Sequence, residues 1–353
     1  MSNSIPTQPL AGSSLVVSDS TEHPMASGDL ADDEGLLANR YQIFKILGRG
    51  GFAITYLARN VYLPGQPLCV IKHLVPKFTN PALLTIAKWR FYVEARTLSH
   101  LGSHSQIPLL IDYFRKDGEM YLVQEYIPGA TLFDAVRSQS VLTESQAVKT
   151  EAEVQDFLVE MLHLLTYVHS CRLIHRDIKP QNIIHCPTDN RLVLIDFGAV
   201  ADREGSHQDD QRLTIKAIGT PGYAPPEQIS GQPVYASDIY ALGMTCIFLF
   251  TGKEPIYFAV DPRTSEVRWR AGVKVSEDLA DIIDKMIRIS LPDRYQSAVH
   301  VLQAIESRQL RHKLRRYMDN KYTQGMSDTK AIANDLNLPP AVQWAMRIAS
   351  QQE

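Results

Sequence analysis

Cysteine is scarce in this sequence, and the few cysteines form no metal-binding or disulfide pattern. The 353-residue chain has four cysteines, which are widely separated and include no C-x-x-C pair. Each lies within or beside an apolar stretch, so we interpret them as reduced thiols in or near the core. The histidines form no H-E-x-x-H arrangement either, and a zinc site is not expected.

Basic residues are absent from the start of the chain, and a long apolar run is absent throughout. No Lys or Arg precedes Arg40, so the basic region of a secretory signal and the arginines of a transit peptide are missing. The most apolar stretch, 239–250, lies between Asp238 and Lys253 and is too short to cross a bilayer. We therefore expect a cytoplasmic protein with no membrane partner, and a buried helix over 239–250.

Neither sign of charge predominates in the composition. The net charge is -3 at pH 7, with 44% hydrophobic and 21% charged residues. This balance gives no general reason to expect binding to nucleic acid or to anionic membranes. The chain is long enough to bury a substantial core and to form two lobes with short extensions.

Apolar side chains are few in the first 38 residues, which are rich in Ser, Thr, Pro, Gly and acidic residues. Such a segment cannot bury enough surface to offset the entropy lost on ordering. We therefore predict a disordered N-terminal tail over residues 1–38. A docking or phosphoacceptor tail is the functional alternative.

A basic stretch near the end of the sequence has apolar residues on one helical face, namely Leu310, Leu314 and Tyr317. We predict a helical C-terminal extension over residues 308–353. Within it, residues 329–347 only faintly resemble a helix-turn-helix and few cations follow, so no nucleic-acid partner is expected.

A glycine-rich turn, 48–53, separates two stretches of strand composition at 41–47 and 54–58. Glycines allow backbone N–H groups to approach phosphate oxygens, because no Cβ stands in the way. The turn alone would suit an ordinary hairpin equally well. A dinucleotide-binding turn would need a helix after the glycines, and a strand is predicted there instead.

A lysine ends the next predicted strand, 68–72. Its ammonium group would point among apolar neighbours, where a charge needs a partner. A helix predicted from about 83 to 101 supplies Glu94, because Phe91, Leu98 and Leu101 lie on the same helical face and turn that face inward. A solvent-exposed glutamate is the alternative.

The most informative stretch is 175–182, His-Arg-Asp-Ile-Lys-Pro-Gln-Asn. The carboxylate of Asp177 can accept a hydroxyl proton, Lys179 can neutralise a transferring phosphate, and the amide oxygen of Asn182 is a hard ligand suited to Mg²⁺. The segment follows a helix predicted around 154–165. Together, these three side chains supply the base, the cation and the metal ligand that phosphoryl transfer needs.

The strand predicted at 192–195 ends at Asp196-Phe197-Gly198. A polar turn followed by an incidental Asp-Phe-Gly is the alternative interpretation. An H-R-D-x-x-x-x-N loop followed by D-F-G is, however, the signature of protein kinases. The chain resembles a bacterial serine/threonine kinase of the eukaryotic type over about 41–307, and its G-G-F-x-x-T-Y-L-A and G-T-P-G-Y-A-P-P-E-Q motifs are similar to those of cyanobacterial members.

The resemblance implies an α+β, two-lobed protein kinase fold over 39–307. A small β-rich N-lobe with one main helix would occupy 39–126, and a larger, mainly helical C-lobe would occupy 127–307. The implied function is ATP-dependent phosphorylation of Ser or Thr hydroxyls on protein substrates, with autophosphorylation, in bacterial signalling. A catalytically weak kinase-fold scaffold that acts through partner binding is the alternative. Its usual sign would be loss of Lys72, Asp177 or Asp196, and all three are present.

The resemblance also implies roles for individual residues, with ATP and Mg²⁺ or Mn²⁺ as cofactors. Asn182 and Asp196 would hold the metal, and Lys179 and Thr220 imply a preference for Ser and Thr. The catalytic residues implied are Asp177, Lys179, Lys72, Glu94 and Thr220. The residues implied at the nucleotide are Gly48, Arg49, Gly50, Gly51, Phe52, Ala53, Thr55, Val70, Lys72, Gln124, Glu125, Ile127 and Ile184.

Arg176 stands beside the implied base, where such kinases bind a phosphorylated activation loop. Thr214 is the preferred acceptor and Ser206 the other candidate, while Asp209 and Asp210 could substitute for the phosphate. The expectation rests on a guanidinium that would otherwise lack a partner. A static polar loop is the alternative.

Two further residues are expected to have structural roles. Asp238 would cap the helix that begins at 237 and hold the backbone of the catalytic loop. Arg294 would pair with Glu227.

The sequence departs from the commonest kinase pattern at Ala53, Thr55, Pro225 and Tyr240, and none of these changes removes a chemical group. Ala53 stands in place of the third glycine of the turn and adds a methyl group beside the phosphates. Thr55 would place a hydroxyl above the adenine.

We predict that Ala53→Gly binds ATP modestly more tightly than the wild type, because close backbone approach is what this turn contributes. Isothermal titration calorimetry of the two proteins tests this. Unchanged or weaker binding by the variant would show that the steric argument is wrong.

Overall fold

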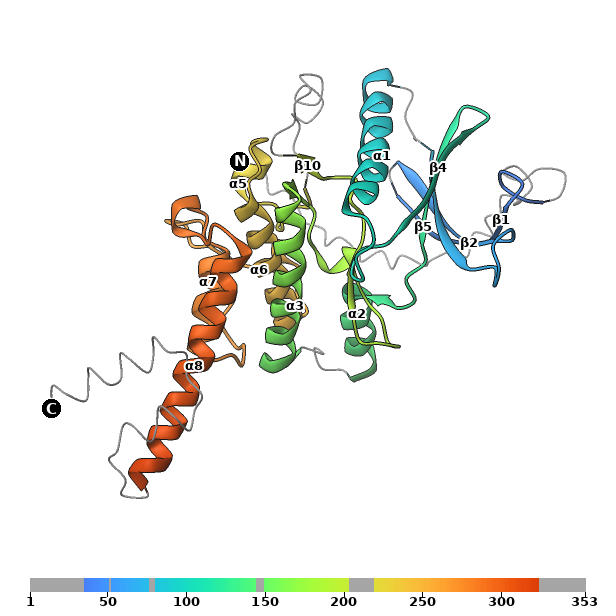
Figure 1. The fold of residues 1–353 in the computed structure, drawn as a ribbon. Coiled ribbons are helices and arrows are strands. Elements are labelled where there is room, and N and C mark those ends of the chain that lie inside the picture. The colour runs from blue at the N-terminus through green and yellow to red at the C-terminus, as the bar shows by residue number, and fades with distance from the viewer. Residues whose placement is uncertain (1–34, 51, 76–79, 144–148, 203–218, 324–353) are drawn as a thin grey trace, which may run out of the picture.

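A five-stranded antiparallel sheet forms one end of the molecule (Figure 1). The structure is a computed structural model that describes residues 35–50, 52–75, 80–143, 149–202 and 219–323. The strands of the five-stranded sheet lie in the order β1-β2-β3-β5-β4. Their bounds are Tyr41–Arg49 for β1, Ala53–Asn60 for β2, Leu68–Leu74 for β3, Leu110–Lys116 for β4 and Glu119–Glu125 for β5.

Alternation along β3 sends neighbouring side chains to opposite faces of this sheet. Ile71 belongs to a buried cluster with Tyr41, Tyr56 and Tyr121 on one face. Lys72 therefore points to the other face. The predicted strand 68–72 was too short, because β3 continues to Leu74 and pairs with β2 along that length.

Helix α1 (Pro81–Leu101) packs against β3, β4 and β5. The side chain of Asn80 caps its first turn by accepting a hydrogen bond from the N–H of Ala82 at 2.9 Å. Phe91, Glu94 and Leu98 are all buried on the inner face of this helix. The predicted inward orientation of Glu94 is confirmed.

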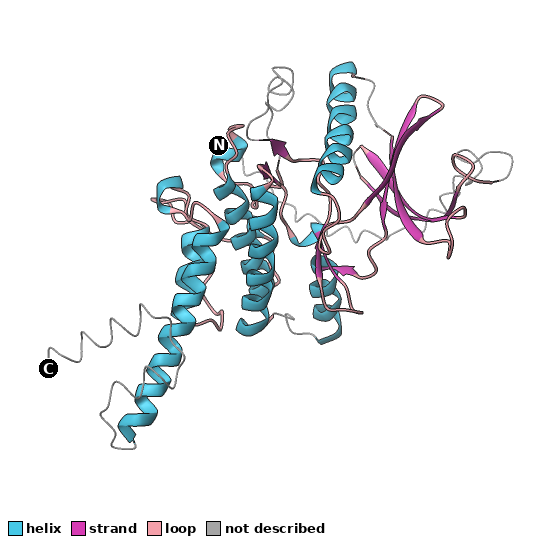
Figure 2. Cartoon of the chain, in the orientation of Figure 1, coloured by secondary structure: helices cyan, strands magenta, loops and turns pink. Residues whose placement is uncertain are grey.

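The rest of the described chain is mainly helical, and Figure 2 shows strands concentrated at one end and helices at the other. Helices α3, α6, α7 and α8 contact one another in succession and lie side by side (Figure 1). The helices of this lobe are α2 (Leu132–Thr143), α3 (Glu151–Ser170), α5 (Pro226–Ile229), α6 (Tyr235–Thr251), α7 (Glu277–Met286) and α8 (Ala298–Thr323). The expected α+β, two-lobed architecture is confirmed.

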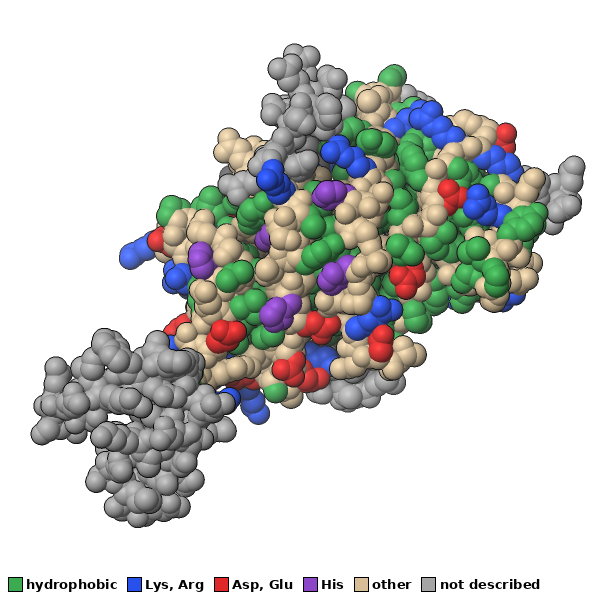
Figure 3. Space-filling view, in the orientation of Figure 1, with side chains coloured by type: hydrophobic (Ala, Val, Ile, Leu, Met, Phe, Trp, Pro, Cys, Tyr) green, Lys and Arg blue, Asp and Glu red, His purple; other side chains and the backbone are tan. Residues whose placement is uncertain are grey.

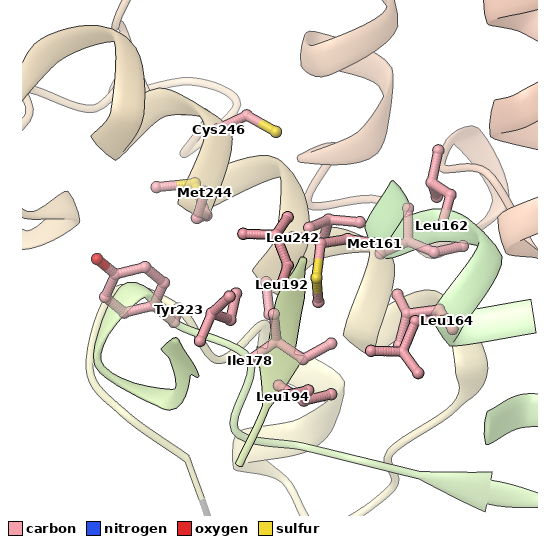
Figure 4. Packing of buried hydrophobic residues seen from close by; sticks show 14 of the residues in the cluster. Met161, Leu162, Leu164, Ile178, Leu192, Leu194, Tyr223, Leu242, Met244 and Cys246 are labelled. Atoms are coloured by element: carbon pink, nitrogen blue, oxygen red, sulfur yellow. The ribbon is translucent and has the colours of Figure 1, made fainter. Parts of the chain in front are cut away.

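Helix α6 lies at the centre of this lobe and is buried from Ala236 to Thr251, as expected for its apolar composition. Figure 4 shows Leu242 of this helix close to Met161 of α3 and to Leu192, which begins a short strand. Gly243 lets α7 approach, because a Cβ there would lie 2.7 Å from a methyl group of Ile287. Among the described helices, none is both long enough and apolar enough to span a membrane.

Short strands and single helical turns connect these helices and support the loops between them. Strands β6 (Ala130–Thr131), β8 (Ile183–His185) and β9 (Leu192–Leu194) form one small sheet, and β7 (Leu173–Ile174) pairs with β10 (Ala201–Asp202). The 3₁₀ turns are η2 (Pro180–Asn182), η3 (Pro255–Tyr257) and η4 (Leu291–Asp293).

The last described helix, α8, begins at Ala298 and not near residue 308. The basic stretch predicted as a separate final helix is therefore the second half of a longer helix, which projects beyond its neighbours in Figure 1. The predicted division of the chain at residue 307 stays a prediction. Residues 1–34 of the predicted tail, and 324–353 of the predicted extension, lie outside the described residues.

Arg308 anchors α8 to the starts of two other helices. Its guanidinium contacts Glu151 at the first turn of α3 and Gln155 one turn later. It also donates to the hydroxyl of Ser276, the N-cap of α7, at 2.8 Å. Ser276 in turn donates its backbone N–H to Glu151 at 2.8 Å. Because only 8% of the Arg308 side chain is exposed, these partners satisfy a charge that is largely removed from water.

We predict that Arg308→Met lowers the free energy of unfolding by about 2–3 kcal/mol, because Glu151 then loses its cation and the site loses its charge-assisted hydrogen bonds. Urea denaturation at pH 7 measures the change. Arg311→Met, at an exposed position on the same helix, is the control and should change stability by less than about 0.5 kcal/mol. Equal effects of the two substitutions would contradict the anchoring role.

Candidate active site

A buried carboxylate holds the backbone of the 175–182 loop in place. Asp238, fully buried in α6, accepts the backbone N–H of His175 at 2.9 Å and that of Arg176 at 2.8 Å. The side chain of His169 contacts the same carboxylate at 2.9 Å. Arg176 has a φ of 66°, a left-handed conformation that is unfavourable for a residue with a Cβ. The bonds to Asp238 stabilise this strained turn.

The expectation that Asp238 caps its helix is wrong, although its predicted contact with the catalytic loop is confirmed. Helix α6 begins at Tyr235, and the hydroxyl of Ser237 accepts the N–H of Val234 at 3.1 Å. Asp238 is thus already inside the first turn. Burial alone would raise the pKa of its carboxyl, but the hydrogen bonds from His169 and from the Arg176 backbone lower it.

The side chains of Asp177, Lys179 and the distant Thr220 form a closed triangle of hydrogen bonds. Lys179 Nζ donates to Asp177 Oδ2 at 2.7 Å and contacts Thr220 Oγ1 at 2.7 Å. The Thr220 hydroxyl donates to Asp177 Oδ1, also at 2.7 Å. A carboxylate that accepts from a cation and a hydroxyl is held in one orientation, and Asp177 is one of the residues that line the cleft described below.

Asn182 completes this group from the 3₁₀ turn η2. Its amide nitrogen donates to the carbonyl oxygen of Asp177 at 2.8 Å and to Oδ2 of the same residue at 3.0 Å. These bonds fix the orientation of the amide, and within the described residues its oxygen accepts no hydrogen bond. An oriented amide oxygen and the carboxylate of Asp196 are the type of donor set that Mg²⁺ uses when phosphate oxygens and water supply the remaining ligands.

Lys72 joins the two lobes through two carboxylates. It forms an ion pair with Glu94 of α1, and its Nζ lies 3.4 Å from Oδ1 of Asp196. Burial alone would lower the pKa of Lys72, but the charges of Asp196 and Glu94 outweigh this and raise it. The charge of Lys72 is the main cause of the lowered pKa of Asp196. The predicted pairing of Lys72 with Glu94 is therefore confirmed, and it extends to Asp196.

The backbone and packing of residues 195–198 position the Asp196 carboxylate near Lys72. Asp196 itself has a left-handed φ of 69°, and the backbone N–H of Ile195 donates to Asn182 at 2.8 Å. Phe197 is fully buried and meets the ring of His175 edge-on, with 4.8 Å between ring centroids. A Cβ at Gly198 would lie 3.5 Å from oxygen atoms of both Asp196 and Glu94. The DFG segment thus packs on the catalytic loop on one side and on α1 on the other.

These groups face a cleft of about 370 Å³ between the lobes. The predicted site residues that line it are Gly50, Phe52, Ala53, Thr55, Lys72, Glu94, Asp177, Asp196 and Thr220. Sequence reasoning missed several other lining residues, among them Leu74, Arg90, Phe91 and Ala199. The helical spacing offered a signal for one of them, because Arg90 lies one turn before Glu94 on the same face.

The remaining residues predicted at the nucleotide do not line this cavity, and Gly51 lies outside the described residues. Gly48 and Arg49 end β1, and Val70 pairs with the buried Gln124 across β3 and β5. The backbone N–H of Glu125 donates to Leu109 at 2.9 Å. Ile127 and Ile184 pack together with Cys186 and Val193 in a small cluster. The purine end of the predicted nucleotide site stays a prediction.

Arg176 is not the unpaired cation that the sequence led us to expect. Its Nε donates to the carbonyl oxygen of Ala199, and Nη2 donates to that of Val200 at 3.0 Å. Burial lowers the pKa of Arg176 to about 10, so it remains charged at neutral pH. The premise that its donors lack partners is therefore wrong, and the dependence on an activation-loop phosphate stays a prediction. Thr214 and Ser206 lie outside the described residues, as do Asp209 and Asp210.

The predicted pairing of Arg294 with Glu227 is confirmed. Arg294 Nη1 donates to Glu227 Oε1 at 2.6 Å and Nη2 donates to Oε2 at 3.3 Å. The Arg294 side chain is fully buried, and Ser237 donates to the same carboxylate at 2.8 Å. This bond network holds α5, and with it the segment that carries Thr220, against α6.

Comparison with known proteins agrees with this arrangement. A family model described as "Protein kinase domain" matches residues 41–305. The chain is 46% identical over 275 residues to "Serine/threonine-protein kinase B" of Synechocystis, covering 76% of this chain and 47% of that protein. It is 43% identical over 277 residues to "Serine/threonine-protein kinase PknA" of Nostoc, covering 77% and 48%. The chain thus spans about half the length of the curated relatives it matches.

We predict that Asp238→Ala destabilises the protein by about 2–4 kcal/mol, because two buried backbone N–H groups lose their acceptor. Because the native pKa of Asp238 is lowered, its stabilising effect is complete above the unfolded pKa of about 4 and is lost as the pH falls through the native value. Denaturant unfolding from pH 7 to pH 3 should therefore show the difference between wild type and variant shrinking at the acidic end.

Asp238→Asn is the companion variant, because it retains one acceptor oxygen and should be destabilised less than Asp238→Ala. A stability difference that does not change with pH would show that the Asp238 carboxylate does not hold the loop through its charge.

Proposed function

Because this chain belongs to the protein kinase family, we propose that it transfers the terminal phosphoryl group of ATP to Ser or Thr hydroxyls of protein substrates. The observation that carries the proposal is the triangle of Asp177, Lys179 and Thr220, with 2.7 Å along each side. Asp177, which bonds to Lys179, and Thr220 line the same cleft as Lys72 and Asp196. The relatives named as serine/threonine-protein kinases support this assignment.

In the proposed reaction, each residue has one task. Lys72, held by Glu94, binds phosphate oxygens of ATP, and Asp177 accepts the proton of the substrate hydroxyl. The hydroxyl oxygen then forms a bond to the terminal phosphorus as the bond to the bridging oxygen breaks, and ADP leaves with that oxygen. Lys179 neutralises charge on the phosphoryl group during transfer.

A divalent cation, Mg²⁺ by our proposal, would neutralise the phosphate charge when bound. Asn182 and Asp196 are the residues that would hold it, since they offer an oriented amide oxygen and a carboxylate whose pKa is lowered chiefly by Lys72. Mn²⁺ has similar preferences for oxygen ligands and would be an alternative.

Thr220 supports the preference for Ser and Thr acceptors. Its hydroxyl is hydrogen-bonded to both Asp177 and Lys179. These bonds place the start of the segment 220–227 beside the proposed base, Asp177. An acceptor hydroxyl near Asp177 must therefore come from a side chain that fits between this segment and the catalytic loop. A short aliphatic hydroxyl suits that position, and protein Ser or Thr residues supply it.

We place the reaction in the cytoplasm, where ATP is abundant and thiols stay reduced. All four cysteines are free, and Cys69, Cys186 and Cys246 are buried, which suits a reducing compartment. On the face shown in Figure 3, acidic and basic side chains are interspersed with apolar ones. Protein substrates, in our proposal, approach at the mouth of the cleft near Thr220.

We predict that Lys72→Met and Asp196→Asn abolish phosphoryl transfer while the protein stays folded. The first removes the phosphate cation and the second weakens the metal site. Transfer of labelled phosphate from ATP to a generic protein acceptor, with Asp177→Asn as a third variant, measures the effect. Lys88→Met, an exposed lysine of α1, is the control and should keep wild-type activity.

Phosphoamino-acid analysis of the same product should show phosphoserine or phosphothreonine. The proposed mechanism would be wrong if any of the variants Lys72→Met, Asp196→Asn or Asp177→Asn transferred phosphate as fast as the wild type. An inactive wild type that still binds ATP would instead favour a non-catalytic kinase fold.

A further inference from the structure

Gln228 is a buried polar residue of α5 to which the proposed mechanism assigns no task. Only 3% of its surface is exposed. Its side-chain nitrogen, Nε2, donates to the backbone carbonyl oxygen of Arg176 at 2.6 Å, across 52 positions of the sequence. This bond links α5 to the catalytic loop at the residue before Asp177.

The peptide group between Arg176 and Asp177 is held at both of its polar atoms. Gln228 donates to the oxygen, and the N–H of Asp177 donates to Nδ1 of His175 at 3.3 Å. A left-handed residue such as Arg176 keeps its conformation only where the surrounding contacts determine it. The direction in which the Asp177 side chain leaves the backbone therefore depends on the bond from Gln228.

The same amide lies against the backbone that leads into Thr220. Gly219 has a φ of 146°, and a Cβ at this residue would lie 2.6 Å from Nε2 of Gln228. Glycine at position 219 thus permits the close approach of the amide. The hydroxyl of the next residue, Thr220, donates to Asp177. Gln228 therefore lies beside both segments that meet at the proposed base.

Helix α5 gives this amide a fixed position. The neighbouring residue, Glu227, accepts hydrogen bonds from the buried Arg294 and from Ser237 of α6. The backbone N–H of Gln228 donates to the carbonyl oxygen of Pro225 at 3.0 Å. The core of the helical lobe thus determines where the amide lies, and the amide determines where the two segments lie.

We infer that Gln228 is a positioning residue for phosphoryl transfer, whose amide sets the Asp177 base and the Thr220 hydroxyl in their mutual geometry. This rests on the proposed function, in which Asp177 accepts the proton of the acceptor. Gln228 is not one of the described residues that line the cleft, so it acts through Asp177 and Thr220. An apolar side chain of the same size would leave the buried Arg176 carbonyl without this donor, and the loop would shift to find another.

The test compares the full-length wild type with Gln228→Leu, Gln228→Glu and Gln232→Glu. Leucine fills a similar space without a donor, whereas glutamate keeps the shape of glutamine and places an ionised oxygen against the Arg176 carbonyl. Gln232 lies at an exposed position just beyond α5, so Gln232→Glu is the matched control for the added charge. Phosphate transfer to a generic protein acceptor gives kcat, calorimetry gives the affinity for ATP with Mg²⁺, and thermal melting checks folding.

We expect Gln228→Leu to lower kcat by about tenfold to a hundredfold, because small displacements of a catalytic group slow the reaction by such factors. Its affinity for ATP should stay at the wild-type value, because the groups that line the cleft are unchanged. Gln228→Glu should lose as much at about pH 8 and recover relative to the wild type towards about pH 6, because burial favours the protonated acid, whose O–H can donate to the Arg176 carbonyl. Gln232→Glu should match the wild type throughout.

The inference is overturned if Gln228→Leu keeps the wild-type kcat. It is also overturned if the affinity of this variant for ATP falls by the same factor as its kcat, since that would indicate general damage to the fold. If Gln228→Leu does not stay folded, Gln228→Glu decides, and a kcat ratio to the wild type that does not change with pH overturns the inference. Failure of the proposed function would be seen separately, as a wild-type protein that binds ATP but transfers no phosphate.

Discussion

One buried ammonium group holds the two lobes in register. Lys72 lies on β3, Glu94 on α1, and Asp196 beyond the end of β9, and the lysine contacts both carboxylates. An unpaired charge at this depth would cost several kcal/mol. The position of each of the three elements is therefore constrained by the other two, and the geometry of the cleft depends on all of them meeting at one nitrogen atom.

The catalytic loop depends on a second polar group placed within an apolar helix. Arg176 and Asp196 both adopt left-handed backbone conformations, each of which costs on the order of 1–3 kcal/mol for a residue with a side chain. Asp238 offsets part of this cost through its bonds to the loop backbone. The Asp238 carboxylate is held in one position, because the packed core around it leaves no room for another rotamer.

Positive and negative groups alternate through the cleft. The carboxylates of Glu94, Asp177 and Asp196 are interspersed with the cations of Lys72, Arg90 and Lys179. Such a site is close to neutral by itself, so the proposed nucleotide would bring an excess of negative charge. A divalent cation bound with the nucleotide would offset it.

Local patterns in the sequence were sufficient for the architecture and for most of the catalytic group. The helical spacing around Glu94, the apolar composition of 239–250 and the order of the HRD and DFG segments all depend on neighbouring residues, and the structure agrees with them. Local patterns did not predict the contacts between residues that are far apart in the sequence. The contact of Asp238 with the catalytic loop, 62 and 63 residues away, was expected only from the resemblance.

Tertiary structure alone decided the partners of several other polar groups. It gave Arg176 two carbonyl partners, brought Arg90 into the cleft and tied Arg308 to the starts of α3 and α7. The physical reason is that periodicity and residue type determine which face of an element is buried, whereas hydrogen bonds across the core depend on how helices pack and on where each loop ends. The sequence shows that a buried arginine needs a partner, and for Arg176 and Arg308 only the packed chain determines which partners those are.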